Sequence, residues 1–142
     1  MVEIKGMKFP EGLFYSKDHM WAKVEDDVVK VGVTDLAQKA AGEIVFVRLL
    51  PPGRKVRKNA PLGTLESGKW VGPLKSPVTG TIVEVNEKVK ENPKLLNTDP
   101  YGEGWLVKIK PDDFEKDKID LISDPETLKE FIEAEAAKLL KE

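Results

Sequence analysis

The sequence contains Gly42-Glu43-Ile44-Val45-Phe46-Val47 and, further on, Gly80-Thr81-Ile82-Val83-Glu84-Val85, two segments with one pattern of glycine and β-branched residues. A second pair of similar segments follows them, Val56–Leu62 and Val89–Leu95. Residues of this kind favour strands. Two similar β-layers predict a mainly β, pseudo-symmetric sandwich or flattened barrel, in which each half covers the apolar face of the other. A chance similarity of two hairpins is the alternative interpretation.

A turn-forming stretch with a lysine lies between the two copies. It reads Leu65-Glu66-Ser67-Gly68-Lys69-Trp70-Val71-Gly72-Pro73. Its glycines and proline favour turns, so we expect Lys69 at a loop tip that joins the halves. A lysine at such a tip is usually only a solvated charge. It is also where a ligase could acylate an amine, since the amide removes the charge and keeps the flexible stem.

A hairpin and a short helix are predicted ahead of the first copy. Residues 21–25 and 28–33 are rich in β-formers and are joined at Asp26-Asp27, which predicts a hairpin. Thr34 is suited to cap a short helix near residues 35–41. Gly42 is placed to end that helix through a left-handed residue.

A second helix is predicted at the C-terminal end. Apolar residues at helical spacing place it at about residues 124–141, and we expect its apolar stripe to pack on the sheets. The length suits a single domain over residues 1–142, with a core at about 14–111.

Composition excludes several classes of function. The net charge is −2 and the lysines are scattered among acids, which argues against binding to nucleic acid. The chain has no cysteine and one histidine, His19, so we expect no metal site and no catalytic constellation, hence no enzyme. No apolar run could span a membrane, and no targeting signal is visible, so a cytoplasmic location is expected.

Several motifs resemble, in order, those of the H protein family of the glycine cleavage system. They are Tyr15–Trp21, Val31–Gln38, Gly42–Val47, Glu66–Lys69, Ser76–Gly80, Asn97–Trp105 and Lys108–Pro111. The resemblance runs from about Phe14 through the C-terminal helix. It implies a hammerhead lipoyl-type fold, a flattened β-barrel or sandwich of two small sheets with added helices.

The resemblance also implies a carrier with a covalent lipoate on Lys69, attached by a lipoate ligase or lipoyl transferase. Glu66, Ser67, Gly68 and Trp70 would surround the lipoyl group, and Glu66 would guide the ligase. The implied cargo is an aminomethyl group, and the implied partners are glycine decarboxylase, aminomethyltransferase and dihydrolipoamide dehydrogenase. Members of the family are usually monomers, so the resemblance implies a monomer. Biotin acceptors resemble Ala-Met-Lys-Met, and nothing similar flanks the lysine.

The sequence departs from the family where glycine-cleaving relatives hold the amine of the loaded arm. Carboxylates expected at two positions are replaced by Met20 and Pro73. Either other groups hold the amine, or the chain is an H-like lipoate-binding protein that carries sulfur intermediates for a heterodisulfide-reductase-like sulfur oxidation system. Trp70 and Leu36 would then line a more apolar cleft. An unmodified structural or docking module is a third hypothesis.

Overall fold

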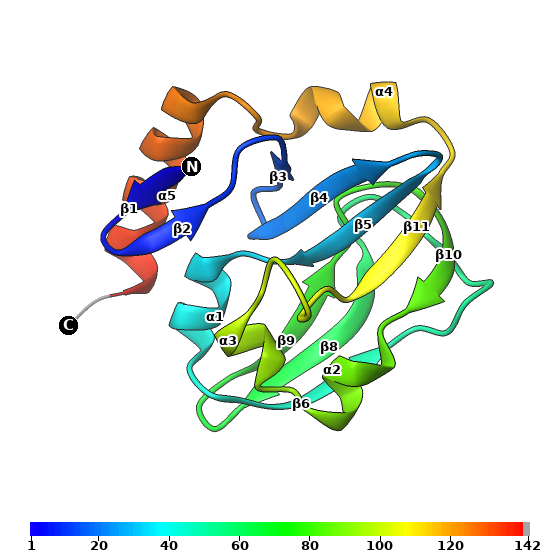
Figure 1. Cartoon of the computed structure of the whole chain (residues 1–142), viewed down its shortest axis with the longest axis horizontal. Coiled ribbons are helices and arrows are strands. Elements are labelled where there is room, and N and C mark those ends of the chain that lie inside the picture. The colour runs from blue at the N-terminus through cyan, green and yellow to red at the C-terminus, as the bar shows by residue number, and fades with distance from the viewer. Residues whose placement is uncertain (141–142) are drawn as a thin grey trace.

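The computed structural model describes residues 1–140, and its largest element is a six-stranded antiparallel sheet (Figure 1). The strand order is β3-β4-β5-β11-β10-β7. The strands are β3 (Phe14–Tyr15), β4 (Met20–Glu25), β5 (Val28–Val33), β7 (Lys55–Val56), β10 (Gly80–Val85) and β11 (Val107–Pro111). The predicted hairpin is confirmed, because β4 and β5 pair from Met20 opposite Val33 to Glu25 opposite Val28.

A three-stranded antiparallel sheet packs against the large one. It has the order β6-β8-β9, and its strands are β6 (Ile44–Leu49), β8 (Pro61–Ser67) and β9 (Val71–Lys75). Inward-facing side chains of both sheets form one buried cluster, in which Val31, Leu62, Ile82 and Ile109 are fully enclosed. Burial of apolar surface between the two sheets is the main force that holds them together. The predicted mainly β sandwich is confirmed.

The sequence repeat is only partly a structural repeat. Strands β6 and β10 contain the first segments of the two copies, and both show a shift of register, between Ile44 and Phe46 and between Ile82 and Glu84. The second segments differ: the first contributes strands β7 and β8, whereas the second forms helices α2 (Glu87–Glu91) and α3 (Leu95–Thr98). The prediction of two similar layers is wrong at this point.

The reason is local. The Asn86 side chain accepts a hydrogen bond from the backbone N–H of Lys88 at 3.1 Å and so caps α2, which starts a helix directly after β10. After β6 the chain instead passes through Pro51-Pro52-Gly53, whose residues favour a turn.

The predicted short helix is confirmed as α1 (Asp35–Ala41). The Thr34 hydroxyl accepts a hydrogen bond from the Ala37 N–H at 3.2 Å, and Gly42 ends the helix with φ of 83°. Two short helices after β11 were not predicted, α4 (Phe114–Asp117) and the 3-10 helix η1 (Lys118–Asp120).

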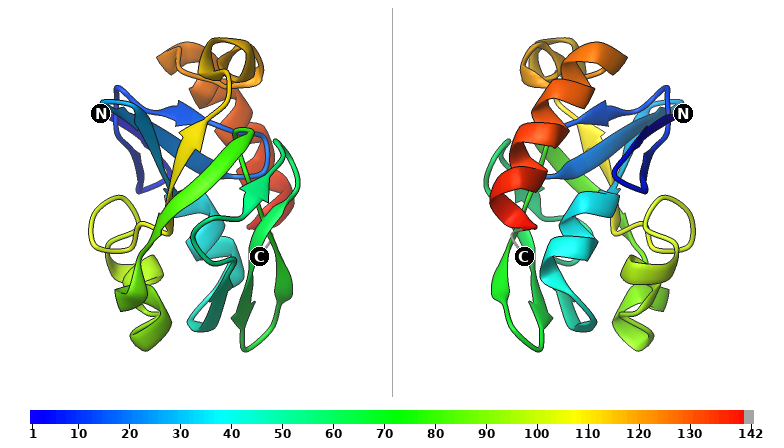
Figure 2. Two further views of the ribbon diagram at one scale, coloured as in Figure 1. Left: turned by 90° about the vertical axis from the view of Figure 1, so that its right-hand side faces the viewer. Right: turned by 90° about the vertical axis from the view of Figure 1, so that its left-hand side faces the viewer.

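The C-terminal helix α5 (Pro125–Leu139) is capped by Asp124. It packs against an N-terminal hairpin of β1 (Val2–Ile4) and β2 (Met7–Phe9), a sheet that was not predicted (Figures 1 and 2). Its buried residues form a second cluster with residues of both the hairpin and the large sheet; they are Leu128, Ile132 and Ala136. The apolar stripe therefore packs on the large sheet, as expected, and also on the unpredicted N-terminal hairpin. The predicted helix end at 141 lies outside the described residues.

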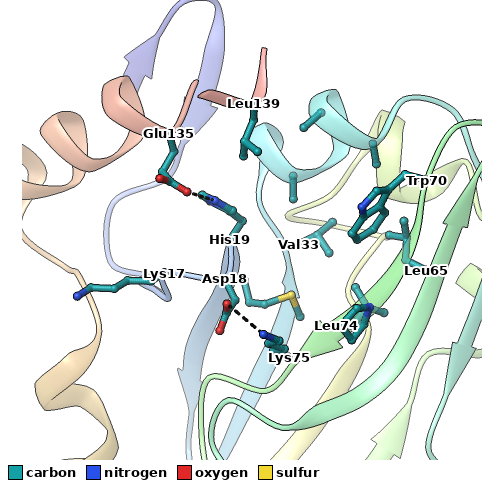
Figure 3. Close-up of a pocket in the computed structure, with 15 residues that line it drawn as sticks. Lys17, Asp18, His19, Val33, Leu65, Trp70, Leu74, Lys75, Glu135 and Leu139 are labelled. Carbon is teal, nitrogen blue, oxygen red and sulfur yellow. Dashed lines mark hydrogen bonds and ion pairs between the residues drawn. The ribbon is translucent and has the colours of Figure 1, made fainter. Parts of the chain in front are cut away.

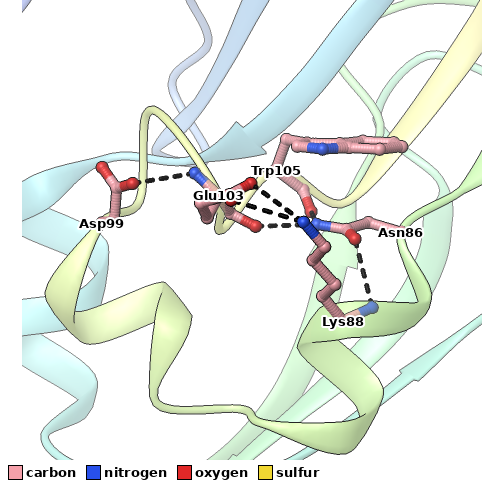
Figure 4. A network of polar contacts seen from close by, with 5 residues as sticks. All are labelled: Asn86, Lys88, Asp99, Glu103 and Trp105. Carbon is pink, nitrogen blue, oxygen red and sulfur yellow. Dashed lines mark hydrogen bonds and ion pairs between the residues drawn. The ribbon is translucent and has the colours of Figure 1, made fainter.

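The loop between α3 and β11 is fixed by one side chain (Figure 4). The Asn86 amide donates to the carbonyl oxygens of Glu103 at 2.8 Å and of Trp105 at 2.7 Å. The Glu103 N–H donates to Asp99 Oδ2 at 2.9 Å, and the Glu103 carboxylate accepts from Lys88 Nζ at 3.3 Å. These contacts tie β11 to the end of β10.

Candidate functional site

Lys69 lies on a tight turn between β8 and β9. The backbone N–H of Ser67 donates to the Trp70 carbonyl at 2.7 Å and closes the turn. The Ser67 hydroxyl is buried beneath it, 3.4 Å from both the Trp70 carbonyl and the Lys69 N–H. Both strands belong to the small sheet, so the expected loop tip is present, but it lies within one sheet and does not join the two halves.

The side chain of Lys69 is exposed and forms no ion pair within residues 1–140. Its stem lies against Gly42 at the end of α1: a methyl group built on Gly42 would lie 3.1 Å from Lys69 Cε and 3.7 Å from Lys69 Nζ. Since glycine offers no side chain here, the end of the lysine stem lies directly beside the Gly42 backbone, and the residue as a whole remains exposed to solvent. The amine is therefore open to another protein.

The backbone under the lysine is held by Asn97 of α3. The Asn97 amide donates to the Gly42 carbonyl at 2.8 Å and to Gln38 Oε1 at 3.0 Å, and Asn97 Oδ1 accepts from the Ile44 N–H at 2.9 Å. One side chain thus joins α1, the turn after it and the start of β6. Three hydrogen bonds from a partly buried amide make this turn rigid.

The other predicted site residues point in different directions. Glu66 lies on the exposed outer face of the small sheet, directly between Phe46 and Val71 in register. The Trp70 ring turns the other way and covers Gly72, where an added methyl group would come within 2.2 Å of it. Ser67 and Gly68 form the turn itself. The five residues therefore share a hairpin but do not converge on one point.

A cleft of about 600 Å³ opens beside the hairpin, and Trp70 reaches into it (Figure 3). Its walls come from α1, β4, β5, the β8–β9 hairpin and α5. The apolar part of the lining consists chiefly of Met20, Val33, Ala37, Leu65, Trp70 and Leu74. Such a mostly apolar pocket with polar groups at its rim is typical of a binding site.

The expectation that Leu36 lines this cleft is wrong. Leu36 is fully buried in the second apolar cluster, beneath the N-terminal hairpin and α5. One step along the helix turns a side chain by about 100°, and it is Ala37 that faces the cleft, with Ala40 and Ala41.

Carboxylates at the rim of the cleft have partners (Figure 3). Asp18 lies 4.0 Å from Lys75 Nζ, and Glu135 Oε1 lies 2.8 Å from His19 Nε2. Glu135 also pairs with Lys138 at 3.4 Å. The role of Glu135 could not be predicted, because no local pattern indicates that α5 returns to a histidine so far away in the chain.

Within residues 1–140, no group of three or more His, Cys, Asp or Glu side chains is placed to hold a metal ion. No helix in the same range is long and apolar enough to cross a membrane.

The two packed sheets with their protruding hairpin form the hammerhead fold of lipoyl-type domains. The structure resembles the crystal structure of a glycine cleavage system H protein from Mycobacterium marinum, with a TM-score of 0.78, 34% sequence identity, and coverage of 86% of this chain and 98% of that one.

Comparison of sequences gives the family. The family model described as glycine cleavage H-protein matches residues 13–135. Glycine cleavage system H protein 2 of Aquifex aeolicus is 47% identical over 138 residues, 94% of this chain and 86% of the relative. The H protein of Coprothermobacter proteolyticus is 47% identical over 127 residues, 89% of this chain and 98% of the relative. The chain belongs to the glycine cleavage H-protein family.

Proposed function

We propose that this chain is a carrier in which lipoate is joined by an amide bond to Nζ of Lys69. The observation that supports this most strongly is the placement of that amine: exposed, without an ion pair in residues 1–140, and carried on the hydrogen-bonded turn between β8 and β9. Formation of the amide removes a charge that nothing in this part of the structure compensates. The apolar cleft beside the hairpin is large enough to take an acyl chain.

In this proposal the protein fixes the root of the arm and the bound group supplies the chemistry. The lipoyl group accepts an aminomethyl group at glycine decarboxylase, delivers it to aminomethyltransferase, and is reoxidised by dihydrolipoamide dehydrogenase. The role of the chain is to hold the lysine at the tip of the hairpin. When the chain is docked on a partner, the tethered lipoyl group is then present at a high effective concentration near the active site of that partner. The names of its relatives favour this cargo.

The cleft favours a second candidate cargo. Met20, which is 2% exposed, and Pro73 lie on its wall and carry no charge. The carboxylates of Asp18 and Glu135 are already paired with basic groups. Because a protonated amine is costly to desolvate without acceptors, this cleft would hold an aminomethyl group weakly. A sulfur intermediate carried for a heterodisulfide-reductase-like system would need no such acceptor.

Glycine–bicarbonate exchange tests the proposed cargo. The chain is first lipoylated and shown by intact mass to carry one lipoyl group. It is then incubated with glycine decarboxylase, glycine and labelled bicarbonate, beside its unmodified form and a lipoylated glycine cleavage H protein. We expect label in glycine above the level of the unmodified chain but below that of the control H protein. No label with the lipoylated chain, while the control works, would exclude glycine cleavage and favour the sulfur carrier.

Placing acids at Met20 and Pro73 tests, in the same assay, whether the missing carboxylates limit exchange. The double variant Met20→Glu, Pro73→Asp should raise exchange toward the level of the control H protein, because it provides acceptors for the amine. Val83→Glu, an acid added on the large sheet away from the cleft, serves as the matched control and should not raise it.

A further inference from the structure

The outer face of the small sheet carries an apolar patch beside Lys69, made of Val45, Phe46 and Val71. These residues are 54%, 51% and 63% exposed. Phe46 and Val71 lie in one row across the sheet, on either side of Glu66. Exposed apolar residues that gather in this way, next to a functional residue, usually mark a surface for another protein.

A bulge in β6 creates the patch. Ile44 pairs with Ser67 and Phe46 with Glu66, so Val45 is an extra residue that has no partner in β8. In a regular strand two successive side chains face opposite sides, but here both Val45 and Phe46 are exposed. The bulge therefore places a second apolar side chain in solvent.

The same bulge in the large sheet shows that the fold does not require an apolar residue at the position of Phe46. In β10 the position equivalent to Phe46 is Glu84, which pairs across the sheet with Lys108 at 3.5 Å. This position therefore holds an ion pair, and Val83 beside it is an exposed valine like Val45. In β6 an aromatic ring takes the place of the acid, and the opposite residue, Glu66, forms no ion pair within residues 1–140.

The geometry of acylation indicates which partner covers this patch. A lysine stem has only four carbons, so the acylating enzyme must enclose the turn itself to reach Nζ. Enzymes that act on the far end of a loaded arm need only reach the end of that arm. A protein interface covers roughly 800 Å² on each partner. The three strands of the small sheet span only about 10 Å from β6 to β9. The contact area of an enzyme centred on the Lys69 turn therefore includes Val45, Phe46 and Val71.

We propose that Val45, Phe46 and Val71 form the docking surface for the enzyme that acylates Lys69. This inference rests on the proposed function. The partner would present an apolar surface to Phe46 and Val71, with a basic group opposite the unpaired Glu66. The cleft face of the hairpin is walled by α1 and α5, whereas the outer face is open.

The rate of acylation tests the proposal. Wild type and variants are incubated with lipoate, ATP and a lipoate–protein ligase that modifies the wild type, and kcat/KM is obtained from intact mass at several protein concentrations. For Val45→Ser with Phe46→Ser we expect kcat/KM to fall about ten- to hundredfold, through KM, as for loss of an aromatic hot spot. Val83→Ser, at the equivalent bulge of β10, is the matched control and should stay within about twofold of wild type.

A second variant distinguishes loss of the docking surface from misfolding of the protein. Phe46→Glu with Glu66→Lys copies the pair Glu84 and Lys108, which the same bulge already accommodates in the large sheet. It should keep the melting temperature of the wild type and lose acylation as strongly as the serine variant.

The outcomes separate the two proposals. If the ligase leaves the wild type unmodified while modifying a control H protein, the proposed function fails. If the wild type is modified and both patch variants react at its rate, only the docking surface fails. Patch variants that are acylated normally but lose exchange with glycine decarboxylase would assign the patch to that enzyme and overturn the inference.

Discussion

Strands β6 and β10 have the same sequence pattern and the same bulge, yet their outer surfaces differ. Their inner faces are alike, because Ile44 and Ile82 are both buried in the core between the sheets. Outside, β10 presents Glu84 in an ion pair with Lys108, and β6 presents Phe46 beside an unpaired Glu66. The backbone thus decides which side chains face solvent but leaves their chemistry free. We therefore read the ion pair on β10 as typical of a surface that faces water, and the aromatic ring on β6 as typical of a surface that faces a protein partner.

The glycines that begin the two repeats give the largest expected difference between the halves. A methyl group on Gly80 would lie 2.2 Å from the carbonyl oxygen of Lys110, so Gly80→Ala must displace the backbone of β11. We expect it to lower the free energy of unfolding by about 3 kcal/mol. Gly42→Ala meets only the flexible stem of Lys69, but at φ 83° and ψ −159° its backbone lies in a region almost restricted to glycine, so we expect a loss of about 2 kcal/mol.

Urea denaturation measures both changes. A loss for Gly42→Ala clearly larger than that for Gly80→Ala would show that tight packing adds to the backbone strain at the Gly42 turn. The picture of a lysine stem resting freely on this turn would then be wrong.

The two asparagines that fix loops in the two halves should have a smaller effect on stability. Asn97→Ala and Asn86→Ala each remove hydrogen bonds to backbone groups, and each should cost about 2 kcal/mol. Their local effects should differ. Asn97 accepts from the Ile44 N–H, so hydrogen exchange at Ile44 should become faster in Asn97→Ala and stay unchanged in Asn86→Ala. Equal hydrogen exchange at Ile44 in both variants would contradict the view that Asn97 holds the start of β6 independently of Asn86.

The outer surfaces should contribute least to stability. The pair of Glu84 and Lys108 is exposed, so Glu84→Gln should change the free energy of unfolding by less than about 0.5 kcal/mol. Phe46→Ser should cost about 1 kcal/mol, because half of the side chain is buried and serine favours strands less than phenylalanine does. If urea denaturation of Phe46→Ser shows a loss of unfolding free energy several times larger, the ring contributes to packing of the protein itself. The contrast between the outer faces of β6 and β10 would then not indicate a docking surface.

Local sequence signals predicted the elements that depend on local physics. The β4–β5 hairpin, the helix α1 between Thr34 and Gly42, and the start of α5 after Asp124 all follow from turn, capping and periodicity rules. The turn that carries Lys69 was predicted for the same reason. The family resemblance supplied the hammerhead arrangement, which the residues alone left open between a sandwich and a barrel.

Features that depend on tertiary packing could not be predicted in this way. The N-terminal hairpin is only three residues per strand and is covered by α5, from the other end of the chain. The burial of Leu36 in that region and the pairing of Glu135 with His19 depend on the same long-range contact. The similarity of Val56–Leu62 to Val89–Leu95 was misleading, because the cap at Asn86 selects a helix for the second copy.

Intact mass after incubation with lipoate, ATP and a lipoate–protein ligase tests the role of Lys69 most directly. Wild type and Lys75→Arg, which changes the other lysine of the hairpin, should each gain one lipoyl group, and Lys69→Arg should gain none. Addition to Lys69→Arg at the wild-type level would place the arm elsewhere. No addition to the wild type, beside an H protein that is modified, would leave an unmodified docking module as the better description.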